Sequence, residues 1–179
     1  MELEQFEANS QLKHLNMRLG PENGAELCRV GEVIKVACRE QFPVQHPDPN
    51  FDYPGVDILV FRERARGRPD GGIEARNTVP MSNNVLDWSK PETWTAMLDR
   101  SPCGTGTCAV MAVMYERGEL KVGEPFCHKS IVGSAFIGTI LEQVTLKFGG
   151  EDKIRTAIIP QIEGSAYITQ YSEVVVDPE

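Results

Sequence analysis

The chain has 179 residues, of which 41% are hydrophobic and 25% are charged, and this composition is typical of one globular domain rather than of a disordered or fibrous protein. Its formal net charge of -8 would repel the phosphate backbone of a nucleic acid, and the densest basic stretch, residues 62–68, is interrupted by Glu63, Ala65 and Gly67, which favours a solvated loop over a nucleic-acid contact. Neither a signal peptide nor an apolar run long enough for a membrane is visible, so we expect the five cysteines to be free thiols in a reducing cytoplasm.

The first 42 residues divide into a leader and a helix. Residues 1–20 are interpreted as a leader that is separate from a domain at 21–179 and has only a weak helical pattern. Residues 23–42 predict a helix in which Asn23 is the cap and Glu26 completes a capping box. The residues expected to form its buried stripe are Leu27, Val30, Ile34 and Ala37.

The middle of the chain predicts short strands separated by loops. Residues 56–61, 73–81 and 94–98 have the composition of strands, although Pro80 weakens the end of the second. The connections at 42–53 and 64–72 are rich in proline or glycine, and the connection at 83–93 contains Pro91.

After Gly118 the pattern changes to strands almost to the end, at 126–132, 136–148, 154–162 and 166–176. The chain therefore predicts two helices and roughly seven strands that do not alternate regularly. We expect an α+β fold with a mostly antiparallel sheet.

Between these regions lies a Gly-rich turn followed by an apolar helix. Residues 108–115 have no polar stripe, so we expect this helix to be buried on every side. Unpaired N–H groups at the start of a helix bind anions such as a carboxylate or a thiolate. Cys103 is placed there as a thiolate, and Gly104 and Thr105 offer donors to a carboxylate, which suggests chemistry on an amino acid or a related acid.

A Gly-rich turn before a helix can also serve other functions. This turn lacks the Gly-Lys-Ser/Thr ending of a phosphate-binding loop and the spacing of a dinucleotide fingerprint. A zinc site formed by Cys103, Cys108, Cys127 and His128 is disfavoured because the chain has no Cys-x-x-Cys pair. A Cys–His hydrolase would need His46 or His128 as its base. A purely structural turn before a core helix also remains open on the residues alone.

The segment Asp-Arg-Ser-Pro-Cys-Gly-Thr-Gly-Thr at residues 99–107 resembles the second catalytic motif of the proline racemase family. The similarity continues through 109–118, 123–126, 128–138 and 164–169. Together with an upstream stretch at 31–47, it covers nearly all of residues 21–179.

This resemblance implies a cofactor-independent racemase or epimerase of proline or hydroxyproline, with no metal, in a fold similar to that of diaminopimelate epimerase. Members of the family have two similar halves, each a curved sheet around a central helix, with the site between them. By similarity, Cys103 is one of two catalytic thiols, Asp99 holds the cationic ring nitrogen, and Gly104 and Thr105 bind the carboxylate. A related dehydratase branch typically has Thr at this position, so Cys103 favours the epimerases.

The chain departs from the family pattern in its other half. The first motif of the family, Cys-Gly-His, is absent from the 179 residues, and Cys28 and Cys38 fall in the predicted helix at 23–42. We therefore expect a truncated carboxy-terminal half that is inactive alone and needs a second copy or the missing amino-terminal half. The last strand, about 165–176, is expected to belong to that missing half. The alternatives are a dehydratase-type member or a non-catalytic interaction module derived from the family.

Overall fold

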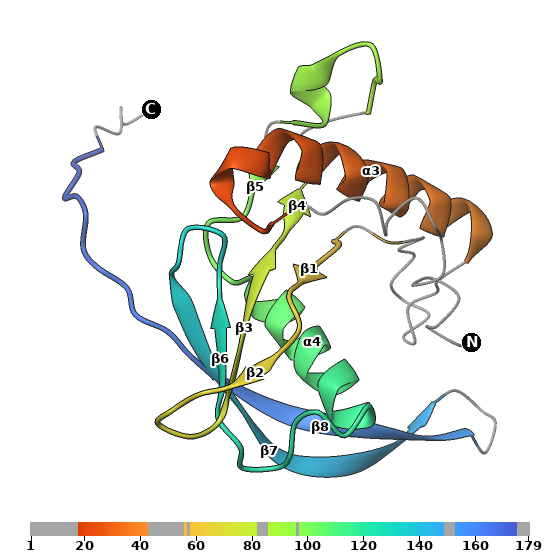
Figure 1. The fold of residues 1–179 in the computed structure, drawn as a ribbon, viewed down its shortest axis with the longest axis vertical. Helices are drawn as coiled ribbons and strands as arrows, with labels where there is room; N and C mark the ends of the chain where they lie inside the picture. The colour runs from red at the N-terminus through yellow and green to blue at the C-terminus, as the bar shows by residue number, and fades with distance from the viewer. Residues whose placement is uncertain are drawn as a thin grey trace, which may run out of the picture.

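The computed structural model describes residues 18–42, 56, 58–81, 86–95, 97–148 and 153–174 (Figure 1). Within these residues lie two α-helices, α3 (Gly24–Gln41) and α4 (Gly104–Glu116), and two short 3-10 helices, η1 (Pro21–Asn23) and η2 (Pro91–Thr93). Most of the predicted leader at 1–20 falls outside the described residues.

The main sheet is mixed but largely antiparallel. Its strands are β1 (Phe61–Arg62), β2 (Arg66–Gly67), β3 (Ile73–Thr78), β6 (Phe126–Lys129), β7 (Ala135–Phe148) and β8 (Lys153–Glu163). The order is β1-β3-β6-β7-β8, with β2 also paired to β3. Only β3 and β6 are parallel to each other, because the chain crosses over through α4 between them. The α+β prediction with a mostly antiparallel sheet is confirmed.

A second, two-stranded sheet supports α3. It consists of β4 (Pro80–Met81) and β5 (Met97–Leu98), which pair antiparallel. An added side chain at Gly31 of α3 would come within 2.7 Å of the Pro80 ring, so the glycine permits the close approach of helix and strand. Figure 1 shows α3 at the opposite end of the molecule from the long β7–β8 hairpin.

The main sheet curls around α4, as Figure 1 shows. Met111 and Met114 of α4 are fully buried against Phe126 of β6 and Ile140 of β7. A Cβ atom at Gly138 of β7 would lie 2.4 Å from the Met111 sulfur. The absence of a side chain at this position therefore lets the helix seat directly on the strand.

The helix α4 is buried on one face only, so the expectation of burial on every side is wrong. Ala109 and Ala112 are exposed, and the Val113 side chain is 39% exposed. The sheet covers only the face of α4 that carries the methionines. The outer face is as apolar as the inner one and has no cover within the described part of the chain.

The helix α3 is confirmed, but its predicted cap is not. The Asn23 side chain donates to the Arg18 carbonyl instead of accepting from the helix, and Glu26 pairs with Arg29. Leu27, Val30 and Ile34 are buried as expected, whereas Ala37 is half-buried.

The same helix contains a feature that the hydrophobic pattern does not predict. Glu32 and Lys35 form a buried ion pair at 2.6 Å.

Three strand predictions need correction. Among the described residues of the strand expected at 56–61, only Phe61 is in a strand, and among those of the strand expected at 94–98 only Met97 and Leu98 are. Residues 164–174, which cover most of the strand expected at 166–176, form no strand and are exposed throughout. Strand formation requires a neighbouring strand, and this segment leads away from the sheet (Figure 1).

Candidate active site

The sulfur of Cys103 lies at the amino end of α4, as the sequence predicted. Cys103 is the N-cap residue of the helix and is half-buried. Its Sγ accepts a hydrogen bond from the Gly106 N–H at 3.3 Å and lies 3.6 Å from the Thr105 hydroxyl. A side chain at Gly106 would come within 3.1 Å of this sulfur, so the glycine leaves the space that the thiol occupies.

The next two backbone amides belong to exposed residues of the turn. Gly104 and Thr105 are exposed, and within the described residues neither amide donates a hydrogen bond. The first amides of a helix have no acceptor in the preceding turn, and the helix dipole adds positive potential there. The thiol and two unused donors therefore lie side by side, an arrangement that suits a carboxylate next to the sulfur.

Asp99 is linked to the same turn through Ser101. The Asp99 carboxylate accepts from the Ser101 amide at 2.8 Å, and the Ser101 hydroxyl accepts from the Cys103 amide at 3.1 Å. Asp99 is half-buried. The structure thus brings all four predicted site residues, Asp99, Cys103, Gly104 and Thr105, into one turn.

A buried polar layer that sequence analysis missed lies beneath this turn. Asn77 of β3 donates to the Pro102 carbonyl at 2.7 Å, and the Thr107 hydroxyl donates to the same oxygen at 3.2 Å. The Thr107 hydroxyl is also 2.9 Å from Nδ1 of His128 on β6. Each of these three polar side chains is 0% exposed. The available signal was a polar residue at a core position of a predicted strand, which is typical of a functional site.

Burial also sets the charge of His128. Removal from water and, to a smaller extent, the nearby positive charge of Arg62 together lower the pKa of this histidine to about 4. The imidazole is therefore neutral at pH 7 and takes part in the polar layer as an uncharged group.

The alternative chemistries are not supported by the geometry. His128 is bonded to Thr107 and makes no hydrogen bond with Cys103, while His46 lies outside the described residues. In the described part of the chain, no three His, Cys, Asp or Glu side chains are arranged to hold a metal ion. Burial raises the pKa of the Cys108 thiol, which lies further along α4.

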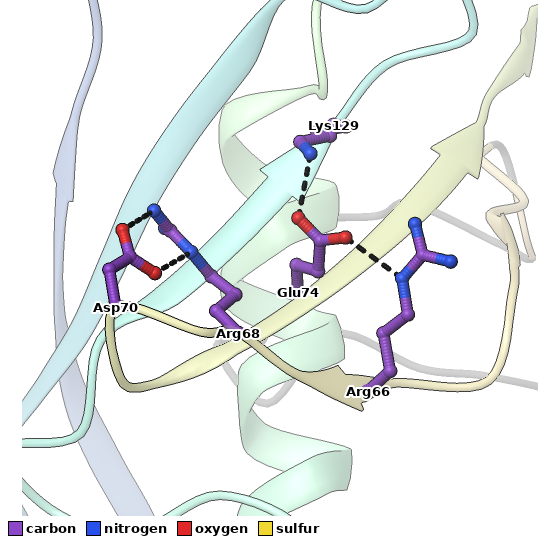
Figure 2. A network of polar contacts seen from close by, with 5 residues as sticks. All are labelled: Arg66, Arg68, Asp70, Glu74 and Lys129. Carbon is purple, nitrogen blue, oxygen red and sulfur yellow. Dashed lines mark hydrogen bonds and ion pairs between the residues drawn. The ribbon is translucent and has the colours of Figure 1, made fainter.

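Three of the four arginines in the basic stretch at 62–68 pair with carboxylates, and two of these three are drawn in Figure 2. Glu74 of β3 accepts from Arg66 at 2.8 Å and from Lys129 at 2.6 Å, and Arg68 pairs with Asp70. The predicted loop contains strand β2, which pairs with β3. These ion pairs leave no uniformly basic surface for a nucleic acid.

A cavity of about 860 Å³ lies beside this stretch, near the carboxyl end of α4, where Arg62 pairs with Glu119. Its lining mixes arginines with glutamates and does not include Cys103. The cavity is therefore distinct from the candidate active site.

No helix among the described residues has the length and apolar character to cross a membrane.

Comparison with known proteins identifies the family of the chain. The model of the family described as proline racemase matches residues 8–179. The chain belongs to the proline racemase family. A proline racemase from Acetoanaerobium sticklandii is 34% identical over 174 residues, which cover 97% of this chain and 45% of that enzyme. A 4-hydroxyproline 2-epimerase from Rhizobium rhizogenes is 32% identical over 174 residues, covering 97% of this chain and 43% of that enzyme.

Solved structures of this proline racemase family agree with the fold. A hydroxyproline epimerase from Agrobacterium vitis with bound trans-4-hydroxy-L-proline matches with a TM-score of 0.64 and 32% identity, over 86% of this chain and 38% of that one. A probable proline racemase from Agrobacterium radiobacter matches with a TM-score of 0.66 and 32% identity, over 93% and 42%. The chain thus spans less than half the length of the relatives it matches.

Proposed function

We propose that this chain provides one half of the active site of a cofactor-independent amino-acid racemase or epimerase that acts on proline or hydroxyproline. The observation that carries the proposal is the Cys103 sulfur at the amino end of α4, with the unused amides of Gly104 and Thr105 beside it. The membership in the proline racemase family supports the substrate class, since the relatives are named for proline and 4-hydroxyproline.

In this proposal Cys103 is the base on one face of the substrate. Its thiolate takes the α-proton and becomes a thiol, while the electron pair of the broken C–H bond delocalises into the substrate carboxylate. The amides of Gly104 and Thr105 donate to that carboxylate, where negative charge develops. Asp99 lies in the same turn and pairs with the cationic ring nitrogen.

Inversion also requires a proton donor on the opposite face of the substrate. Cys108 cannot serve, because five residues along a helix correspond to about 7.5 Å of rise and about 140° of rotation away from Cys103. In this proposal the second thiol comes from an amino-terminal half or from a second copy of this chain. We propose that the chain is inactive until that partner is present.

Two exposed apolar regions are available to such a partner. One is the outer face of α4, which includes Ala109, Ala112 and Val113 and belongs to the helix that carries Cys103 at its start. The other is the segment 164–174, where Tyr167 is 87% exposed and Tyr171 is 89% exposed. Exposed apolar surface of this kind marks an interaction site. We assign the segment to the sheet of the missing half.

Deuterium exchange at the α-carbon tests the proposal. Purified chain is incubated in deuterated water with L-proline and with trans-4-hydroxy-L-proline, and α-deuteration and inversion are followed by NMR and chiral chromatography. We expect no rapid inversion by the monomeric chain and inversion once an amino-terminal half with a Cys-Gly-His motif is supplied. The matched control is Cys103→Ser, which is expected to remain inactive with the partner.

Rapid inversion by a monomer, or full activity of Cys103→Ser, would contradict the proposal. Sedimentation equilibrium on the same samples identifies the species responsible. Activity that rises with self-association would assign the second thiol to another copy of the chain.

The exposed regions also favour a second candidate function, a non-catalytic interaction module derived from the family. This candidate predicts association that is unchanged by Cys103→Ser. A clean monomer at high concentration in sedimentation equilibrium would exclude it.

A further inference from the structure

The backbone of Cys103 has a conformation that residues other than glycine do not favour. Its φ is 63° and its ψ is 120°, and Cys103 is the one non-glycine residue with positive φ among the described residues. L-residues avoid this region because the Cβ atom crowds the backbone. Such strain persists only where the surrounding contacts hold it. Hydrogen bonds of the two peptide planes on either side of Cys103 supply these contacts.

The peptide plane that precedes Cys103 is fixed at both ends. Its carbonyl, that of Pro102, accepts from Asn77 at 2.7 Å and from Thr107 at 3.2 Å. Its N–H, that of Cys103, donates to the Ser101 hydroxyl at 3.1 Å. The plane therefore cannot rotate without breaking three hydrogen bonds.

The peptide plane that follows Cys103 is fixed by the helix. The Cys103 carbonyl accepts from the Thr107 amide at 2.9 Å, which is the first hydrogen bond of α4. The angles φ and ψ together set the orientation of the two planes on either side of a residue. With both planes held, the positive φ of Cys103 is imposed, and its sulfur is kept over the Gly106 amide.

Hydrogen-bond counting assigns the proton on His128. The Thr107 hydroxyl has one proton and two neighbours, the Pro102 oxygen and His128 Nδ1. If Nδ1 carries the ring proton, His128 donates to Thr107, and Thr107 donates to Pro102. If Nε2 carries it, Thr107 donates to Nδ1 and the bond to Pro102 is lost. The first tautomer makes one more hydrogen bond and is favoured.

The buried polar layer of Asn77, Thr107 and His128 carries a cost in folding free energy, which argues against a purely stabilising role. Within the described residues, the buried Nε2 of His128 and the buried Oδ1 of Asn77 have no hydrogen-bond partner. Burial of an unpaired polar atom is unfavourable, and apolar side chains would fill the same space without that cost.

We propose that Asn77, Thr107 and His128 are positioning residues that hold the Pro102–Cys103 peptide and thereby aim the Cys103 sulfur. None of these three side chains forms a hydrogen bond with the Cys103 sulfur. Asn77 and Thr107 act through the Pro102 carbonyl, and His128 acts through Thr107. The use of this sulfur as a base rests on the proposed function, but its placement does not.

Alkylation of Cys103 measures the placement directly. Native chain is treated with iodoacetamide at fixed pH, and the rate at Cys103 is followed by mass spectrometry of its peptide. The variant Thr107→Val keeps the shape and removes the hydroxyl. We expect an alkylation rate at Cys103 about tenfold lower, because loss of a buried hydrogen bond frees the turn and the sulfur loses the Gly106 donor. The variant Thr107→Ser restores the hydroxyl and should restore the rate.

A matched control separates positioning from stability. Ile140→Val trims a fully buried core residue on β7 and should lower the melting temperature without changing the rate at Cys103. If Thr107→Val does not fold, His128→Phe removes the far end of the network and should slow alkylation about threefold.

Unchanged alkylation in folded Thr107→Val, or in folded His128→Phe where the first variant does not fold, would overturn the inference. Equal slowing in Ile140→Val would do the same. The assay needs no substrate, so its outcome is independent of the deuterium-exchange experiment. A slowed Thr107→Val in a chain that never inverts proline with its partner would reject the proposed function and leave the positioning role intact.

Discussion

The two ends of α4 are held by different kinds of polar contact. At the amino end, uncharged side chains that are fully buried bond to the Pro102 carbonyl and to one another. At the carboxyl end and on the neighbouring strands, arginines pair with carboxylates in ion pairs that are only partly buried, and Figure 2 shows the contacts of Glu74. A fully buried neutral group cannot replace its hydrogen bond with one to water, so these bonds fix a conformation, whereas partly exposed ion pairs exchange with water at lower cost.

The largest expected effect on stability comes from a charge placed in the buried layer at the amino end of α4. Asn77→Asp keeps the shape of the side chain but sets a carboxylate against the Pro102 carbonyl. We expect a loss of at least about 3 kcal/mol in the free energy of unfolding at pH 8, because a buried charge without a partner is strongly unfavourable. Urea denaturation followed by circular dichroism measures it.

Thr78→Val is the matched control for Asn77→Asp. Thr78 is the next residue of β3 and is also buried, but its hydroxyl has no partner among the described residues. Its replacement by an isosteric apolar side chain is expected to be nearly neutral. A loss as large as that of Asn77→Asp would show that any change in this strand is disruptive.

The second effect is a dependence of stability on pH through His128. Its pKa in the folded protein is about 4, below the ordinary value of 6.5, so between these values the unfolded chain binds more protons. The stabilisation is complete above pH 6.5 and is lost as the pH falls to 4, by about 3 kcal/mol. Denaturation curves at steps of pH measure the slope.

In His128→Phe this slope should flatten between pH 6.5 and 4. Phenylalanine preserves the aromatic contact with Phe126, whose ring centroid lies 4.8 Å from that of His128. An identical slope in the variant and the parent would assign the acid sensitivity to other groups.

The third effect isolates the backbone strain at Cys103. Cys103→Gly and Cys103→Ala both remove the sulfur, but only glycine tolerates the φ of 63°. We expect the glycine variant to be about 1 kcal/mol more stable than the alanine variant. Thermal unfolding of the pair compares them, and equal melting temperatures would mean that the turn relaxes without cost.

The smallest effect is expected at the partly exposed ion pairs of Glu74. Hydrogen bonds from Lys129 and then Arg66 lower the pKa of the Glu74 carboxyl group. Glu74→Gln should nevertheless leave the urea midpoint unchanged within error, because water and salt replace these contacts. A clear loss of stability that disappears in 1 M salt would show that the network in Figure 2 is stronger than its exposure implies.

The sequence predicted what depends on local pattern and missed what depends on distant contacts. Periodicity gave α3 and the long strands β7 and β8, and the Gly-rich turn gave Cys103 at the start of α4. The buried layer was missed because Asn77, Thr107 and His128 come from separate parts of the chain and meet only when β3 and β6 pair beneath α4.

The remaining errors have local causes. The capping box failed because Glu26 pairs with Arg29. The strand expected at 166–176 has the composition of a strand, but strand composition cannot supply a neighbour.

Because α4 is buried on one face only, the stability of this chain depends on whether a partner binds the exposed face. Ala109, Ala112 and Val113 present apolar surface to water in the folded chain. Any molecule that covers this surface in the folded state alone raises the melting temperature by mass action, to an extent set by its concentration and affinity. The melting temperature measured at increasing concentrations of a partner would therefore report the binding of that partner to this surface. Folding and assembly would then be coupled in one equilibrium.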